Sequence, residues 1–250
     1  MMLQGKVAIV TGGGRDIGKA VSKKLAQEGA KVVINYSKNK ERASETLAEI
    51  REIGGDAILV QGDVTKQSDV DKVISETIKT YGNEIHILVN VAGGLVARKT
   101  LEEMDEEFFT NLLRLNLVSA FLVTKAVVPY MKAGASIINF ASQAGRDGGG
   151  AGSMAYATAK GSLMTFTRCL AKELGPRNIR VNAVCPGMIA TTFHDTFTKE
   201  EVRKNVASIT PLRREGLACE VANVVACLAS HETSFVTGAN IDINGGLVFS

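Results

Sequence analysis

The chain has 250 residues, of which 45% are apolar and 22% are charged, and its formal net charge is +3. Such a composition indicates a water-soluble globular protein with a large core. Lys and Arg are dispersed along the chain, so we expect no nucleic-acid surface. No uncharged apolar stretch approaches the roughly 18 residues of a membrane span, and the first residues run straight into a strand pattern. We therefore expect neither a membrane span nor a signal peptide.

The sulfur and imidazole side chains form no metal-binding pattern. The four cysteines include no pair separated by two residues, and the three histidines stand far apart. We therefore expect a reduced, cytoplasmic protein without a bound metal.

Short runs rich in β-branched residues alternate with helical patterns along the chain. We expect strands at residues 6–11, 31–36, 57–61, 85–90, 136–141, 179–184 and 240–243. Patterns rich in Ala, Leu, Lys and Glu separate them, as at 17–29, 41–54 and 69–82. This alternation predicts a doubly wound parallel sheet with helices on both faces, a three-layer α/β/α fold in a single domain spanning 1–250. Ligands then bind beyond the carboxyl ends of the strands.

A glycine-rich turn, TGGGRDIG, follows the first expected strand. Glycines let the backbone approach a pyrophosphate, which the N-terminus of the next helix attracts. Such a turn also occurs merely as a tight turn, but its place after the first strand favours nucleotide binding.

Tyr156 and Lys160 stand four positions apart, so on a helix both side chains project from one face. A phenol has an unperturbed pKa of about 10, and an ammonium about 4 Å away favours the phenolate. The pair would then serve as a proton donor and acceptor near neutral pH. The alternative is an ordinary surface pair.

Eight short segments give the chain a resemblance to a known family. They are TGGGRDIG, GDVT at 62–65, NVAG at 90–93, LNLVSAF at 115–121, Ser142, YATAK at 156–160, RVNAVCPG at 180–187 and TGANIDINGG at 237–246. In this order they resemble the short-chain dehydrogenase/reductase family from end to end. The resemblance implies a Rossmann-type fold, a nicotinamide cofactor, and hydride exchange between a carbonyl and a secondary alcohol.

The same resemblance implies a role for each catalytic candidate. Tyr156 would protonate the carbonyl oxygen, and Lys160 would lower the pKa of Tyr156 and hold the nicotinamide ribose. Ser142 would hydrogen-bond the substrate oxygen. Asn116 would bend its helix and hold a water that links Lys160 to solvent. The implied cofactor-binding residues are Gly12, Gly14, Arg15, Ile17, Gly18, Tyr36, Ser37, Lys38, Asp63, Val64, Asn90, Ala92, Gly93, Tyr156, Lys160, Pro186, Gly187, Ile189 and Thr191.

Two residues depart from the family pattern. Asp16 replaces a glycine of the turn, and Val91 replaces a common asparagine. A carboxylate beside a diphosphate is unfavourable, and a residue with a Cβ tolerates a left-handed backbone less well than glycine. We expect the Asp16 side chain to turn away from the phosphates, toward the helix N-terminus or solvent.

The end of the second strand indicates which nicotinamide cofactor binds. Family members that use NAD place a carboxylate there, which repels a 2′-phosphate. This chain has no carboxylate before Glu41, whereas Arg15, Ser37 and Lys38 suit a phosphate. The pattern favours NADPH/NADP+ over NADH.

The substrate stays open between two classes of small-molecule carbonyl. Residues 191–215 have the length and position of the family's substrate lid, and Arg146 is expected near the cavity mouth. The chain is similar both to 3-oxoacyl-carrier-protein reductases and to sugar and keto-uronate reductases. A catalytically inactive nucleotide-binding scaffold or redox sensor is the alternative from another class.

Two helices carry more apolar residues than one core-facing stripe needs, so a second subunit is expected to cover them. These residues are Leu112, Leu115, Val118, Phe121 and Leu122 on one helix, and Leu163, Met164 and Phe166 on the other. The end of the chain, GGLVFS, is also apolar. In the family these helices form a dimer interface, so we expect a homotetramer, with a dimer as the fallback.

Overall fold

Parallel strands form the centre of the protein, for which a computed structural model describes residues 1–249. The strands span Val7–Thr11 (β1), Lys31–Tyr36 (β2), Asp56–Gln61 (β3), Ile87–Asn90 (β4), Ser136–Phe140 (β5), Arg180–Pro186 (β6) and Asn240–Ile243 (β7). Their order in the sheet is β3-β2-β1-β4-β5-β6-β7, and every neighbouring pair is parallel. All seven expected strands are present, because β-branched runs suit a pleated sheet that is buried on both faces.

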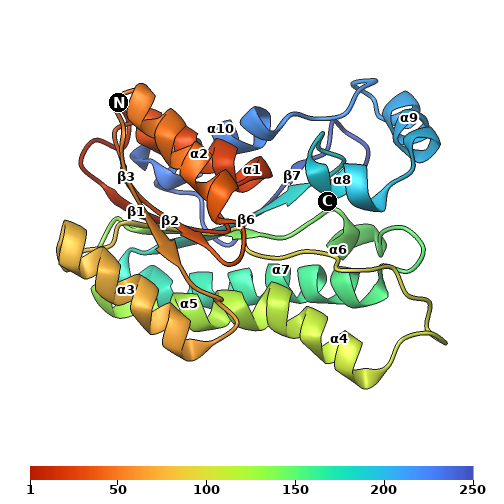
Figure 1. Ribbon diagram of the computed structural model, residues 1–250, viewed down its shortest axis with the longest axis horizontal. Coiled ribbons are helices and arrows are strands. Elements are labelled where there is room, and N and C mark those ends of the chain that lie inside the picture. The colour runs from red at the N-terminus through yellow and green to blue at the C-terminus, as the bar shows by residue number, and fades with distance from the viewer. Residues whose placement is uncertain (250) are drawn as a thin grey trace.

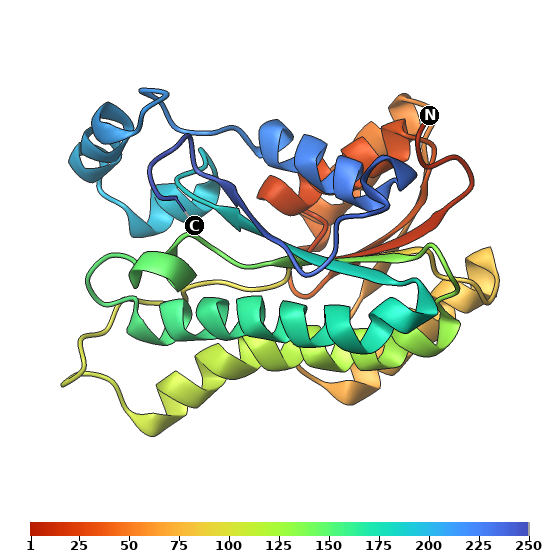
Figure 2. The same cartoon turned by 180° about the vertical axis from the view of Figure 1, so that it is seen from behind.

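Helices cover both faces of this sheet. They span Asp16–Gln27 (α1), Lys40–Glu52 (α2), Gln67–Tyr81 (α3), Glu106–Leu113 (α4), Ser119–Val127 (α5), Ala144–Asp147 (α6), Met154–Leu174 (α7), Thr192–Phe197 (α8), Glu200–Ile209 (α9) and Ala218–Ala229 (α10). Figures 1 and 2 show α1, α2 and α10 on one face and α3, α5 and α7 on the other. The expected doubly wound α/β/α fold of the Rossmann type is therefore confirmed.

Two apolar layers join the sheet to these helices. Alternate residues of a strand face opposite layers. In β1, Ala8 and Val10 pack with residues of α1 and α10, whereas Ile9 packs with residues of α3 and α5. Because helices cover both faces, the strand ends are the parts of the sheet that a ligand can reach.

The strand order changes direction at β1, which lies between β2 and β4. The loops after β1 and β4 therefore lead away to opposite faces of the sheet and leave a crevice between them. The glycine turn follows β1, and the loop 91–105 follows β4. Both segments that the sequence links to the cofactor thus lie at one edge.

A π-helical turn, Arg114–Val118 (η1), joins α4 to α5. Within residues 1–249, the run Glu106–Tyr130 is the one helix that is long and apolar enough to cross a membrane, with a mean hydropathy of 1.5. It packs against α3, α7 and β4, and core helices of water-soluble proteins meet the same criterion. Only 39% of its most apolar stretch is buried, so much of its outer face has no cover within one chain.

α8 and α9 lie between β6 and α10, where the lid is expected. A bridge between Ile189 and Gly216 closes this segment at its base. Arg203 of α9 pairs with Asp195 of α8 at 2.6 Å and with Glu215 at 2.7 Å. These contacts tie the two lid helices to each other.

Candidate active site

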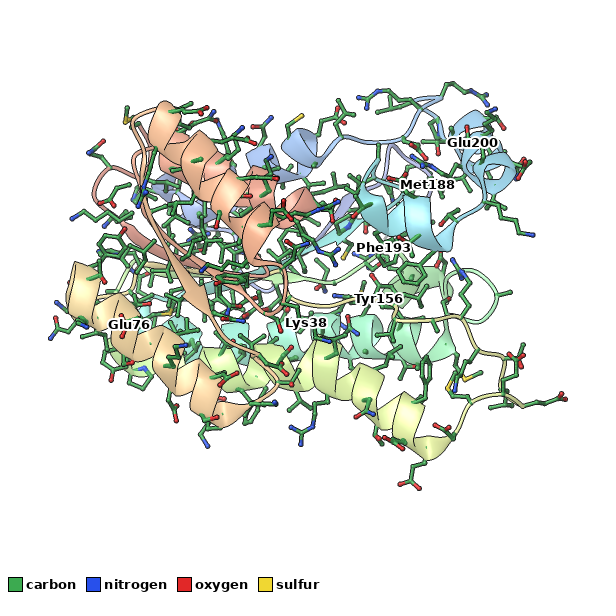
Figure 3. All side chains as sticks on the ribbon, in the orientation of Figure 1. Lys38, Glu76, Tyr156, Met188, Phe193 and Glu200 are labelled. Carbon is green, nitrogen blue, oxygen red and sulfur yellow. The ribbon has the colours of Figure 1, made fainter. Side chains whose placement is uncertain are left out.

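A cavity of about 910 Å³ lies at the carboxyl edge of the sheet. Figure 3 shows Lys38 near the end of β2, whereas Tyr156 lies below Phe193, which belongs to the lid helix α8. The predicted residues that line the cavity are Gly12, Gly14, Arg15, Ile17, Gly18, Tyr36, Ser37, Lys38, Asp63, Val64, Ala92, Gly93, Ser142, Tyr156, Lys160, Pro186, Gly187, Ile189 and Thr191. One connected space therefore joins nearly all the residues that the sequence singled out.

In the glycine turn at one side of this cavity, the backbone of Gly12 packs closely against the backbone of Gly18. Gly12 has a φ of 63°, and a Cβ on Gly18 would collide with the carbonyl oxygen of Gly12. Side chains are excluded at these positions, which leaves the first N–H groups of α1 accessible from the cavity. This arrangement fits the diphosphate of a dinucleotide cofactor.

Basic side chains gather where the adenosine half of such a cofactor would lie. Arg15, Lys38 and Arg42 line this end, and the side chain of Arg15 is 62% exposed. Arg42 was not predicted, although it lies in the first turn of α2 close to Lys38. Glu41 is exposed and does not line the cavity. The end of β2 thus presents cations and no carboxylate to a ligand.

Asp63 also lines this end of the cavity. Its carboxylate accepts hydrogen bonds from the backbone N–H of Thr65 at 3.1 Å and from the Thr65 hydroxyl at 2.7 Å. Burial opposes ionisation, but these bonds outweigh it and lower the pKa of Asp63. Asp63 is therefore a fixed, ionised acceptor.

Tyr156, at the opposite end, comes from the first turns of α7. Its phenol lies beside the hydroxyl of Ser142, and its ring lies 6.1 Å from the ring of Phe193. Burial raises the pKa of Tyr156, while the hydrogen bond from Ser142 lowers it in part. Tyr156 is therefore protonated at neutral pH, with Ser142 beside its oxygen.

Lys160 lies one helical turn further along α7 and is 4% exposed. Its ammonium donates a 2.6 Å hydrogen bond to the carbonyl of Phe140 and lies 5.6 Å from the centroid of the Tyr156 ring. Burial lowers the pKa of Lys160 to about 8. The expected shift of Tyr156 toward the phenolate is wrong for this arrangement, because the ammonium faces the ring and the phenol has lost its water.

Asn116 lies in the π-helical turn, which interrupts the regular α-helical hydrogen bonding between α4 and α5. Its side chain exchanges two hydrogen bonds of 2.9 Å with the backbone of Gly94 and donates a third to Leu112 at 3.0 Å. A Cβ on Gly93 would lie 2.6 Å from Asn116 Oδ1. Asn116 does not line the cavity, and it acts on the site by holding the loop after β4.

Two residues that the sequence analysis placed at the site do not line the cavity. Asn90 does not line the cavity: its side chain points into the protein and donates to Thr124 at 3.2 Å and to Asn139 at 2.9 Å. Arg146 is not at the cavity mouth, because its guanidinium pairs with Asp242 of β7 at 2.7 Å. In both cases the side chain has a buried polar partner elsewhere.

The carboxylate of Asp16 faces neither its own helix N-terminus nor open solvent. It accepts two hydrogen bonds from Thr192, the first residue of α8, one from the backbone N–H at 3.1 Å and one from the hydroxyl at 2.7 Å. The glycine turn is thereby joined to the lid, which is a contact that no local pattern predicts.

An apolar wall near Tyr156 was only partly foreseen. Phe193 belongs to the expected lid. Val202 and Val206 are one turn apart on α9, and this spacing in the sequence is typical of the apolar face of an amphipathic helix. The apolar side chains of this wall are Leu95, Met188, Phe193, Val202, Val206 and Leu247. This end of the cavity suits the apolar part of a ligand.

Comparisons with known proteins agree with this site. The family model described as enoyl-(acyl carrier protein) reductase matches residues 12–248. Versicolorin reductase 1 of Aspergillus parasiticus is 36% identical over 255 residues, which cover 98% of this chain and 97% of that protein. The 3-oxoacyl-(acyl-carrier-protein) reductase of Synechocystis is 39% identical over 251 residues, which cover 98% of this chain and 98% of that protein.

Solved structures extend the likeness to three dimensions. A short-chain dehydrogenase/reductase from Serratia marcescens matches with a TM-score of 0.93 at 31% identity, over 99% of both chains. An NADH-dependent reductase responsible for alginate metabolism matches with a TM-score of 0.90 at 30% identity, also over 99% of both. With the sequence, the fold and the Ser142, Tyr156 and Lys160 geometry in agreement, this chain belongs to the short-chain dehydrogenase/reductase family of oxidoreductases.

Proposed function

We propose that the protein is an NADPH-dependent reductase of a ketone with an apolar body. The observation that carries this proposal is one cavity with two distinct ends. The first end has cations and lacks a carboxylate at the end of β2. The second end has Ser142, Tyr156 and Lys160 beneath an apolar wall.

The reaction joins a hydride and a proton to one carbonyl group. The nicotinamide, when bound, supplies the hydride to the carbonyl carbon. Tyr156 donates its phenolic proton to the carbonyl oxygen, and the Ser142 hydroxyl hydrogen-bonds the same oxygen as negative charge develops on it. Lys160 places a positive charge beneath the Tyr156 ring, which favours the phenolate once the proton has left.

The preference for NADPH rests on charge. A 2′-phosphate among Arg15, Lys38 and Arg42 gains charge-assisted hydrogen bonds that a ribose hydroxyl does not. NAD-specific sites of this fold use a carboxylate at the end of β2, and here Tyr36, Ser37 and Lys38 stand there. One similar structure is named NADH-dependent, so the choice is a property of this end of the site and not of the fold.

The basic groups that line the cavity also bear on the substrate. They are Arg15, Lys38, Arg42, Arg98, Lys160 and His194. Arg98 is bound to two main-chain carbonyls, and burial lowers the pKa of His194, which is neutral at pH 7. Among residues 1–249, therefore, the lining offers no free cation beside Tyr156 for a uronate carboxylate. Of the two candidate classes, we favour a 3-oxoacyl substrate over a keto-uronate.

We propose a cytoplasmic homotetramer, with a dimer as the fallback, and the outer faces of α5 and α7 support the assembly. Phe121 is 44% exposed, and its ring meets that of Phe166 edge-on with the centroids 6.4 Å apart. Phe249, near the end of the chain, is 84% exposed. A second copy of the chain would bury these rings.

A substrate panel tests the proposed function. NADPH oxidation is followed by its absorbance with 3-oxoacyl thioesters, keto-uronates and simple ketones, and each active substrate is repeated with NADH. We expect the 3-oxoacyl thioesters to give the highest kcat/KM with NADPH. Binding of NADPH without turnover of any carbonyl would instead support the inactive scaffold or redox sensor.

A further inference from the structure

The backbone of Asp16 is strained. Its φ of 49° lies in the left-handed region, which glycine adopts readily, Asp less readily, and most other residues with a Cβ rarely. The family pattern has a glycine at this position of the turn. A strained residue at a ligand-binding turn indicates that its side chain has a use that outweighs the strain.

The Asp16 carboxylate caps the lid helix α8. Both its oxygens are engaged by Thr192, by the backbone N–H and by the hydroxyl. α8 has no side-chain cap of its own, because the hydroxyl of Thr191 donates to the carbonyl of Ile189. Asp16 therefore satisfies the first turn of α8 from a distant segment and places negative charge at the positive end of the helix.

Arg98 holds the other end of α8. Its Nε donates to the carbonyl oxygen of Phe197, the last residue of the helix, at 3.1 Å, and its terminal nitrogen donates to the carbonyl of Ala151 at 2.9 Å. A cation at the helix C-terminus complements the free carbonyl groups there. The loop that carries Arg98 is strained as well, since the β-branched Val96 has a φ of 66°.

The segment between these two ends covers the catalytic end of the cavity. Phe193 of α8 packs 6.1 Å from the ring of Tyr156, and it contacts His194 and Phe197 with centroid distances of 5.1 and 5.2 Å. Figure 3 shows Phe193 and Tyr156 on facing sides of the space between the lid and α7. The position of α8 thus decides how closely the cavity is covered above Tyr156.

We propose that Asp16 and Arg98 are positioning residues that hold α8 over the cavity before substrate arrives, and that Asp16 does so while weakening cofactor affinity. A lid that is already ordered need not be ordered by the substrate, which lowers the apparent KM. The Asp16 charge, however, belongs to the turn that fits a diphosphate. Arg15, whose Nε lies 3.8 Å from the carboxylate, offsets that charge only in part, so Asp16 weakens the attraction of the turn for the cofactor. The kinetic test of this inference rests on the proposed function, whereas its structural test does not.

The variant Asp16→Gly separates the two effects, because glycine relieves the backbone strain while the carboxylate is lost. We expect the KM for the ketone to rise about tenfold with kcat retained. We expect the dissociation constant of NADPH to fall in the same variant. General damage to the turn would weaken both ligands, and that result would overturn the proposal.

Thr192→Val is the matched control, since it removes the hydroxyl donor and keeps the Asp16 charge. It should raise the KM without tightening NADPH binding. Asp16→Asn keeps an acceptor for the Thr192 N–H, so its KM should lie between those of the unmodified protein and Asp16→Gly. If the KM for the ketone is the same in Asp16→Asn and Asp16→Gly, the hydrogen bonds between Asp16 and Thr192 do not hold α8 in place.

Hydrogen exchange tests the clamp without any reaction. In the ligand-free protein, amides of α8 should exchange about tenfold faster in Asp16→Gly and in Arg98→Met, while amides of the sheet exchange as before. Unchanged exchange of α8 in both variants would refute the proposal. If the unmodified protein reduces no ketone, the proposed function fails, but the exchange rates still decide whether these residues hold α8.

Discussion

The ammonium of Lys160 lies against the ring of Tyr156, 5.6 Å from its centroid, and donates to the carbonyl of Phe140. Burial therefore dominates at the phenol and raises the pKa of Tyr156, and burial lowers the pKa of Lys160 to about 8. The raised pKa leaves Tyr156 protonated at neutral pH. Protonated tyrosine is the form that can donate to a carbonyl oxygen, so the resting site is poised for reduction.

Removal of the phenolic hydroxyl tests the proton donor. Tyr156→Phe keeps the ring that packs near Phe193 but has no proton to give, so we expect kcat to fall by about 10²–10⁴-fold. The dissociation constant of NADPH, measured by its fluorescence, should change little. Turnover close to that of the unmodified protein would remove Tyr156 from the mechanism.

The shifted pKa of Lys160 predicts a pH dependence of cofactor capture. The ratio kcat/KM for NADPH reports groups of the free enzyme, and the family resemblance implies that the charged form of Lys160 holds the ribose. We expect this ratio to be constant below about pH 7 and to fall as the pH rises through about 8. A profile that stays flat to about pH 9.5 would contradict this role.

Burial of the Lys160 charge also lowers stability at neutral pH. The pKa is about 8 in the folded protein and about 10.4 when unfolded, so the unfolded state binds more protons between these values. The cost is full below pH 8 and disappears as the pH rises toward about 10.4. Lys160→Met should therefore be more stable at pH 7 by about 1–3 kcal/mol, and this advantage should shrink at about pH 9.5.

Urea unfolding at the two pH values measures that difference. Lys160→Met should have a lower kcat than the unmodified protein and a larger free energy of unfolding at pH 7. A Lys160→Met protein that is equally or less stable at pH 7 would show that the buried ammonium is compensated by its bond to Phe140.

Single substitutions at the basic end test the cofactor preference. NADPH should exceed NADH in kcat/KM, and Arg15→Ala or Arg42→Ala should each weaken NADPH about tenfold and leave NADH unchanged. Lys40→Ala is the control, because Lys40 is exposed and does not line the cavity. Equal use of both cofactors by the unmodified protein would show that the end of β2 does not select for a 2′-phosphate.

The apolar outer face of α5 predicts an assembly. Light scattering at micromolar concentration should give about four times the chain mass of 26.5 kDa. Phe121→Glu places a charge in the expected interface and should reduce that mass while circular dichroism stays unchanged. A stable, fully active monomer of the unmodified chain would rule out this interface.

Local patterns predicted the fold well because each strand is a contiguous run whose burial on both faces leaves a clear signal. The sequence also predicted those parts of the candidate site in which a motif fixes the backbone, namely the glycine turn and the pair Tyr156 and Lys160. Prediction failed where a side chain's direction depends on a remote partner. Asp16 bonds a residue 176 positions away, and Arg146 one 96 positions away, and no sequence spacing reports such contacts.

The pKa of Tyr156 was mispredicted for a related reason. The spacing of Tyr156 and Lys160 places both side chains on one face, but it does not say which atom of the ring the ammonium meets. It also does not say how much water the phenol loses. Both depend on Phe140 and Phe193, which come from other elements of the fold.

Because the strands run in parallel, the cavity lies at the edge of the sheet where they end, and the segments that lead into them lie at the opposite edge. The turns that lead into β3 and β4 contain Gly54 and Gly82, and a Cβ built on either meets nothing within 4 Å. These turns lie where the strands begin, whereas the cavity lies where they end. A peptide inserted there, or a support attached there, leaves the mouth of the cavity facing solution, so this edge is the natural handle for immobilising the protein.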